Sequence, residues 1–273
     1  MAAVNSTITR AFDLFFAPFA RANPWVGLVA VSLVSGVALL LVFRCTSNQR
    51  GLRSVKDRLI AHLLEVVLYR DELPVVLRAQ LGVVRDNLRY LAYALVPLAF
   101  MALPVAALLV QIDLRYGRQP ARVGEPIIVA AKLTPEAGSL DTVSLTAPAG
   151  IKIDSPALRI PAEREVDWRI VASAPGSYEL RLTAAGKQFS KTLVAGPRAS
   201  RVVAERVQSG LRQQFLHPGE PPLPSDGPVS SVSISYPGAS LPLLRWRLHW
   251  IWPWLVLSMA FGFALRGPLR VQL

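Results

Sequence analysis

The sequence predicts a multi-domain membrane protein with three transmembrane α-helices, a cytoplasmic helical hairpin and an extracytoplasmic β-sandwich. Three observations support this fold class. Of the 273 residues, 52% are hydrophobic and only 18% are charged, which is fewer than in soluble domains. Three apolar runs, at 24–43, 90–112 and 248–265, approach the roughly 20 residues that cross a bilayer. Between the second and third runs, the hydrophobic pattern changes to the two-residue period of strands.

Composition and motifs exclude several classes of function. The net charge is +12, which is typical of a protein whose arginines flank membrane spans. One cysteine, Cys45, excludes an intrachain disulfide, and three histidines leave little for metal binding. The sequence holds no nucleophile elbow, zinc-protease motif, phosphate loop or dinucleotide fingerprint. We therefore predict no catalytic residues, no cofactor, no metal site and no specific nucleic-acid partner.

Residues 1–23 are expected to form an amphipathic helix that ends near Pro18. Its aromatic residues recur at helical spacing, but it is too short and too polar to span a bilayer. It is interpreted either as an interfacial helix or as a partner-binding helix. Pro24 to Phe43 then forms the first predicted span, without a charged residue.

Residues 44–89 predict a cytoplasmic hairpin of two helices separated by a polar turn at 70–72. Each helix carries an apolar stripe, and facing stripes would close the hairpin on itself. The expected internal seam consists of Leu59, Leu63, Leu77, Leu81 and Leu88. The hairpin either packs only on itself or also binds a partner. The basic residues left facing outward are the partner-binding candidates: Arg53, Lys56, Arg58, Arg70, Arg78 and Arg85.

The second predicted span covers 90–112 and contains Pro97 and Pro104, which kink membrane helices. Residues 113–199 follow as short strands separated by Gly and Pro. The segment Ala174–Leu180, followed by Ala185-Gly186-Lys187, resembles the last hairpin of immunoglobulin-like bacterial domains, and Trp168 is expected in the core. The predicted strands are 127–133, 142–146, 151–153, 165–172, 177–183 and 188–194.

Residues 200–247 are predicted to hold a basic helix from Ser200, a Pro-rich stretch and one short strand around Ile234. The Pro-rich stretch is either a solvated linker or a strip docked on the sandwich. The third span, 248–265, precedes a cytoplasmic tail at 266–273. Indoles favour the headgroup level. The expected membrane-interface residues are Trp25, Trp246, Trp250, Trp252 and Trp254.

Positive charge near the span ends predicts the orientation. Residues 44–89 hold nine Arg and Lys against five Asp and Glu, and the tail contains Arg266 and Arg270 but no acid. Both segments are therefore placed in the cytoplasm. An odd number of spans then places the N-terminus outside the bacterial inner membrane, with the C-terminus cytoplasmic.

This order of segments resembles the three-span core of the YidC/Oxa membrane-protein insertase superfamily. The resemblance covers residues 5–111 and 248–265 and depends on the topology, the N-terminal helix and the hairpin at 52–89. Two features differ: Arg44 and Arg89 lie only at span ends, whereas bacterial insertases carry an arginine in a hydrophilic groove, and a β-sandwich precedes the third span. The segments 44–49 and 261–265 also look like those of uncharacterised bacterial envelope proteins.

Two functions follow as expectations. In the first, the protein is a non-catalytic scaffold or assembly component in contact with the lipid bilayer, and it binds an envelope protein. In the second, which the resemblance implies, it is an insertase-like chaperone whose partner is a ribosome or nascent chain. A hydrophilic lining between the spans would favour the insertase, and a closed bundle would favour the scaffold.

Overall fold

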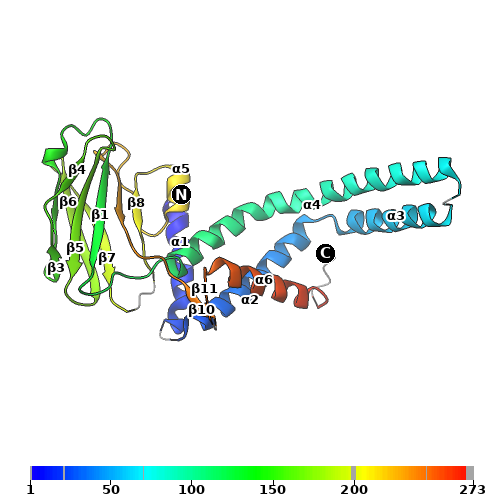
Figure 1. Cartoon of the computed structure of the whole chain (residues 1–273), viewed down its shortest axis with the longest axis horizontal. Helices are drawn as coiled ribbons and strands as arrows, with labels where there is room; N and C mark the ends of the chain where they lie inside the picture. The colour runs from blue at the N-terminus through cyan, green and yellow to red at the C-terminus, as the bar shows by residue number, and fades with distance from the viewer. Residues whose placement is uncertain (1, 21, 70, 198–200, 244, 269–273) are drawn as a thin grey trace. The chain divides into compact units, whose positions relative to one another are not determined.

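The computed structural model describes residues 2–20, 22–69, 71–197, 201–243 and 245–268. The chain forms two compact units (Figure 1). Unit 1 consists of Met1–Gly27 and Leu109–Ile251, and unit 2 consists of Leu28–Leu108 and Trp252–Leu273. The structure confirms helices combined with antiparallel β-sheets.

Unit 1 contains two antiparallel sheets. In the larger sheet the strand order is β3-β5-β1-β9-β8, and β4 also pairs with β5. The smaller sheet has the order β2-β6-β7. A short 3-10 helix, Leu140–Thr142, precedes β2. The strands are β1 Pro126–Leu133, β2 Ser144–Thr146, β3 Ile151–Ile153, β4 Leu158–Ile160, β5 Glu165–Ala172, β6 Gly176–Ala184, β7 Lys187–Ala195, β8 Glu205–Val207 and β9 Val229–Ile234.

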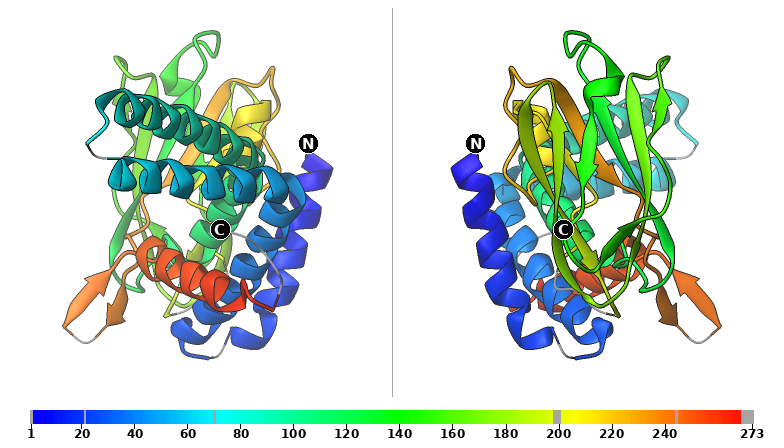
Figure 2. Two further views of the ribbon diagram at one scale, coloured as in Figure 1. Left: turned by 90° about the vertical axis from the view of Figure 1, so that its right-hand side faces the viewer. Right: turned by 90° about the vertical axis from the view of Figure 1, so that its left-hand side faces the viewer.

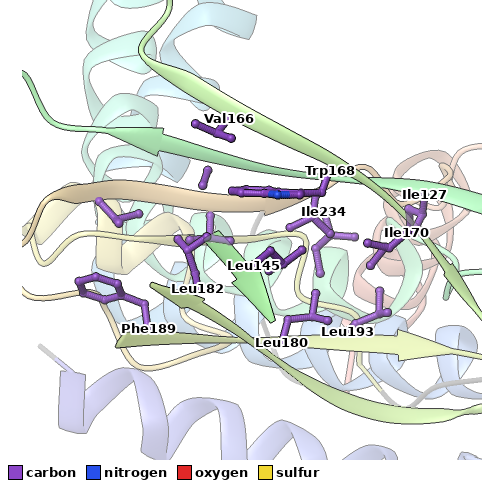
Figure 3. Close-up of a cluster of buried hydrophobic side chains, with 14 of the residues drawn as sticks. Ile127, Leu145, Val166, Trp168, Ile170, Leu180, Leu182, Phe189, Leu193 and Ile234 are labelled. Carbon is purple, nitrogen blue, oxygen red and sulfur yellow. The ribbon is translucent and has the colours of Figure 1, made fainter. Parts of the chain in front are cut away.

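Side chains from both sheets form one hydrophobic core. Alternate residues of β5 are buried, as the two-residue period requires. Figure 3 shows Val166, Trp168 and Ile170 pointing toward Leu180 and Leu182 of the other sheet. Trp168 is 4% exposed, so its predicted place in the core is confirmed. Two sheets that share a core agree with the predicted layering, while the immunoglobulin-like assignment stays a prediction.

The segment after residue 200 differs from the expected helix. Residues 201–204 have no regular secondary structure and β8 follows them, and the helix α5 covers only Leu211–Leu216. The predicted strand near Ile234 is β9, which pairs with both β1 and β8. Strand β9 lies between β1 and β8 in the larger sheet, and its Val229, Val232 and Ile234 are buried. The Pro-rich stretch is docked on β8 at Leu223, because the Leu223 N–H donates to Val207 O at 2.8 Å.

Unit 1 also contains the N-terminal helix α1, Ala2–Phe16, followed by a 3-10 turn at Ala17–Phe19. A proline at the second position of that turn ends the α-helix close to the predicted place. A two-stranded ribbon that was not predicted, β10 Leu241–Leu243 and β11 Trp246–Leu248, lies before the last helix. Trp246 and Leu248 are therefore strand residues rather than the start of a span.

Unit 2 is helical. Most of α2, Pro24–Thr46, belongs to it, together with α3, Gln49–Leu68, and the larger part of α4, Leu73–Tyr116. Figure 2 shows α3 beside the first half of α4, so the predicted pair of adjacent helices is present. The hairpin arm and the second predicted span form one continuous helix of 44 residues that includes Pro97 and Pro104.

Two helices, α2 and α4, are long and apolar enough to cross a membrane by length and composition. The last helix, α6, covers Ile251–Leu265 and has 15 residues. It is shorter than the roughly 20 residues that normally cross a bilayer. The structure therefore supports two candidate spans, and a third span stays a prediction.

Candidate functional site

The α3–α4 hairpin carries the residues that the sequence singled out for partner binding, but its seam differs from the prediction. Leu63, Leu77, Leu81 and Leu88 are exposed, and Leu59 is only half-buried. The buried residues at this closure are instead two apolar ones, Val55 and Ala79, and one charged one, Asp86. A Cβ on Gly82 would lie 2.7 Å from His62 Nε2, so glycine permits the close approach of the two helices.

Asp86 is the main polar link across this seam. Its carboxylate lies 3.2 Å from Arg58 Nε and 3.2 Å from Arg89 Nη1, and His62 Nε2 is 3.7 Å away. Burial raises the pKa of Asp86, but hydrogen bonds and charges from Arg58 and Arg89 outweigh that effect, so its pKa lies below the usual value. Asp86 is therefore a structural anion that holds α3 against α4.

The apolar surface of α3 faces away from this seam. Ile60, Leu63, Leu64 and Val67 are all exposed and follow one another at helical spacing. We call these four residues the α3 apolar face. The exposed Arg53 and Lys56 precede it in the same three-to-four-residue spacing, so the same side of α3 is basic near its start and apolar near the turn.

The predicted basic candidates do not form a single surface. Arg53 and Lys56 lie on α3, whereas Arg78 and Arg85 are exposed two turns apart on α4. Arg58 is paired with Asp86 and also donates from Nη1 to Ser54 Oγ at 2.8 Å. Arg70 lies outside the described residues. The structure thus separates the candidates into two exposed pairs, one on each helix.

The predicted interface tryptophans lie in different environments. Trp246 and Trp252 are exposed, whereas Trp250 and Trp254 are buried. Trp250 Nε1 donates to Asp113 Oδ1 at 3.2 Å, and Trp25 Nε1, which is half-buried, donates to Pro242 O at 3.0 Å. The indoles of Trp250 and Trp254 are covered by protein, and a role of the five tryptophans at a membrane interface stays a prediction.

Helices α2 and α6 pack closely within unit 2. A Cβ on Gly36 would lie 2.7 Å from Ser258 O of α6, and Trp254 Nε1 donates to Ser35 Oγ at 3.1 Å. Ser32 and Ser258 are buried, and their hydroxyls donate to carbonyls of their own helices. Small residues that allow backbones to approach are typical of helix packing in membranes.

In unit 1, the N-terminal helix is attached through a buried arginine. The Arg115 side chain is almost fully covered, pairs with Asp13, and lies over the rings of Phe12 and Phe16. Asp13 also accepts from Arg201 Nη1 at 2.8 Å. The amphipathic helix is therefore bound to protein within unit 1, and no sequence spacing signals this trio because its members are far apart in the chain.

A second buried pair holds the segment after residue 200. Lys191 Nζ donates to Glu220 Oε2 at 2.9 Å and to Val203 O at 2.8 Å. The other oxygen of Glu220 accepts from Thr192 N at 3.0 Å. Burial lowers the pKa of Lys191, and attraction to Glu220 opposes that shift. No nucleophile–base arrangement accompanies this lysine among the contacts described, so the pair fixes structure.

The clefts of unit 1 have the same structural character. One cleft of about 390 Å³ is lined by Phe16, Tyr116 and three arginines, Arg115, Arg118 and Arg122. Each of these arginines already has a partner: Asp13, Tyr236 O and Glu125 respectively. Within the described ranges, no three or more His, Cys, Asp or Glu side chains are grouped as a metal site.

Comparison with protein-family models, curated proteins and solved structures gives no match to this chain.

Proposed function

We propose that this chain is an integral scaffold or assembly protein of the bacterial inner membrane that binds one protein through its hairpin and another through its β-domain. The observation that carries the proposal is the α3 apolar face. The hairpin closes through Val55, Ala79 and Asp86, so the α3 apolar face is left uncovered in the described chain. Exposed apolar side chains gathered on one surface mark interaction sites.

The membrane part of the proposal uses α2, α4 and α6 as three spans. The 15 residues of α6 give about 22 Å of helix, less than the hydrocarbon core of about 30 Å. A short span is accommodated by local thinning of the bilayer and by packing on other helices. The contact of Gly36 with Ser258 supports the second of these explanations.

Orientation has a direct test in intact cells. In a Cys45→Ser background, a cysteine at Ile60 should resist an impermeant thiol reagent because the hairpin is proposed to be cytoplasmic. Cysteines at the exposed Ser139 and Ser225 should react, because the β-domain is proposed to lie outside. Labelling at Ile60 without permeabilisation would contradict the proposed topology.

Partner binding is tested by photo-crosslinking in native membranes from two adjacent positions. Leu64 belongs to the α3 apolar face, whereas the carboxylate of its neighbour Glu65 is hydrogen-bonded, with Oε2 3.0 Å from His62 Nδ1. A photoreactive residue at Leu64 should give a discrete protein adduct that is absent from position 65. Leu64→Glu should abolish the partner's co-purification, while Glu65→Gln should retain it. Equal adducts from both positions, or none, would remove the basis of the proposal.

An insertase-like chaperone is the second candidate, and the combination of Arg53 and Lys56 with the α3 apolar face favours it. Basic side chains suit ribosomal RNA, and apolar side chains suit a hydrophobic nascent chain. Adducts at Leu64 with many different nascent chains, together with ribosome co-sedimentation lost in Arg53→Glu/Lys56→Glu, would establish this function. The closed packing of α2 on α6 favours the scaffold, because its buried serines are already hydrogen-bonded.

A further inference from the structure

The cleft of about 390 Å³ in unit 1 has walls that are fixed by backbone hydrogen bonds. Two bonds, of 2.9 and 3.0 Å, join the segment 117–119 to the segment 237–239. Two more, both of 2.9 Å, join Ala121 to the segment 194–196. The positions of the lining side chains are therefore set by the fold. We call this cavity the arginine cleft, after three of its lining residues: Arg115, Arg118 and Arg122.

The arginine cleft carries a surplus of positive charge. None of its described lining residues is acidic. Arg118 is exposed and donates from Nη1 to Tyr236 O at 3.2 Å, and this neutral carbonyl leaves the charge of Arg118 uncompensated. Arg122 pairs with Glu125 at 3.3 Å, but both side chains are more than half exposed, and surface pairs of this kind contribute little. The guanidinium groups of Arg118 and Arg122 can therefore bind an anion.

The arginine cleft lies where both candidate spans enter unit 1. Helix α2 begins at Pro24 and α4 ends at Tyr116, and the Tyr116 hydroxyl donates to Pro24 O at 3.0 Å. Both residues line the cleft. In the proposed topology these two helix ends lie at the outer surface of the membrane. That topology places the arginine cleft at the level of the outer lipid headgroups.

The lining combines cations with apolar side chains, which suits an amphipathic anion. Phe16, Phe19 and Leu241 line the same cleft as the arginines. A phosphodiester accepts charge-assisted hydrogen bonds from arginine, and apolar side chains suit the first carbons of the acyl chains. A zwitterionic phospholipid also carries an ammonium group, for which the described lining offers no carboxylate. The chemistry of the cleft therefore favours an anionic phospholipid over a zwitterionic one.

We propose that the arginine cleft binds the headgroup of an anionic phospholipid of the outer leaflet, with Arg118 and Arg122 holding its phosphate. Arg115 does not take part, because its side chain is covered and paired with Asp13. The inference rests on α2 and α4 being membrane spans, as proposed above. It is independent of the partner of the α3 apolar face.

Native mass spectrometry of the full-length protein in detergent tests this site. The protein is titrated with dioleoyl phosphatidylglycerol, and apparent dissociation constants are compared. Arg118→Gln/Arg122→Gln should weaken binding about thirty-fold, which corresponds to roughly 1 kcal/mol for each arginine. The matched control Arg181→Gln/Lys187→Gln removes two charges from exposed positions of β6 and β7 and should bind like the wild type. Equal losses in both double variants, or no loss in either, would overturn the proposal.

Two comparisons with the wild-type protein identify the source of the anion. Dioleoyl phosphatidylethanolamine should bind more weakly than phosphatidylglycerol, and equal binding would contradict an anionic headgroup. Excess inorganic phosphate should not displace phosphatidylglycerol, because phosphate lacks the apolar contacts. Complete displacement would identify a site for free phosphate and refute the lipid. Since the protein is solubilised, these results do not depend on the orientation that thiol labelling tests.

A lysine variant separates a role in binding from a role in folding. Arg118→Lys/Arg122→Lys keeps both charges and should retain most of the affinity for phosphatidylglycerol, since lysine also binds phosphate. A loss as large as that of Arg118→Gln/Arg122→Gln would show that the two arginines support the fold rather than the ligand. That result would refute the proposed site.

Discussion

The buried pair of Lys191 and Glu220 allows a quantitative test of how the segment after residue 200 is held. The Lys191 side chain is 1% exposed and that of Glu220 is 11% exposed. Glu220→Gln preserves the shape and the oxygen that accepts from Thr192 N, but it leaves the ammonium of Lys191 without its countercharge. Removing one member of a buried pair costs roughly 3–5 kcal/mol. Glu220→Gln should therefore weaken the attachment of this segment by about that amount.

Hydrogen exchange of the full-length protein is the appropriate assay, because the amides of Gln208 and Leu223 are hydrogen-bonded at this attachment. A loss of about 3–5 kcal/mol corresponds to roughly 10²- to 5 × 10³-fold faster exchange. Lys191→Met should have a smaller effect, since Glu220 is more exposed and retains the Thr192 N–H. Lys191→Met/Glu220→Gln should be less disturbed than Glu220→Gln alone. Additive effects, or single variants that exchange like the wild type, would refute the role of the pair.

The same pair gives a pH dependence of defined sign. Burial lowers the pKa of Lys191 below its ordinary 10.5. At pH values between the lowered pKa of the folded chain and 10.5, the unfolded chain therefore binds more protons than the folded chain. Stability from this group therefore rises with pH up to about 10.5. In Glu220→Gln the folded pKa falls further, so the melting temperature of the variant should move toward the wild-type value as pH is raised. A difference that is independent of pH would contradict this account.

Three further predictions concern packing. Trp168→Ala should lower the free energy of unfolding by about 3–5 kcal/mol, measured by denaturant unfolding, and a loss below about 1 kcal/mol would place Trp168 outside the core. Burial raises the pKa of Tyr236, whose hydroxyl accepts from Val194 N at 2.9 Å, so its contribution to stability is lost as pH rises above about 10. Tyr236→Phe should reduce that alkaline loss, and an unchanged profile would exclude this tyrosine as the cause. Gly36→Val should lower the melting temperature in detergent by forcing α2 from α6, whereas Gly262→Val, where a Cβ meets nothing within 4 Å, should not.

Strand periodicity predicted β1, β3, β5, β6 and β7 to within about a residue at each end. These strands carry alternating β-branched and aromatic side chains between Gly and Pro turns, so the local pattern and the tertiary structure agree. The region after residue 200 could not be predicted in the same way. Val203 and Val207 fit a helical period, but pairing of β8 with β9 and the buried Lys191 favour an extended chain.

The hairpin shows why the candidate site was predicted only in part. The sequence identified two adjacent helices with apolar stripes, and both are present. It did not determine which face of each helix meets the other, because an apolar stripe fits an internal seam and an external partner equally well. Asp86 and Gly82 determine the contact between α3 and α4. The Asp86 carboxylate pairs with Arg58 and Arg89, and Gly82 lies against His62, so these faces of the two helices meet.

The assembly of unit 1 from two distant parts of the chain affects its biosynthesis. Asp13 is made early, but Arg115 and Arg201 complete its site only after much of the chain has been synthesised. The centre of the larger sheet is completed later still in synthesis, because β1 pairs with β5 and β9 and β9 is the last of these strands to be made. An unpaired strand edge attracts other chains. The growing chain is therefore vulnerable to aggregation during the interval between the synthesis of β1 and that of β9.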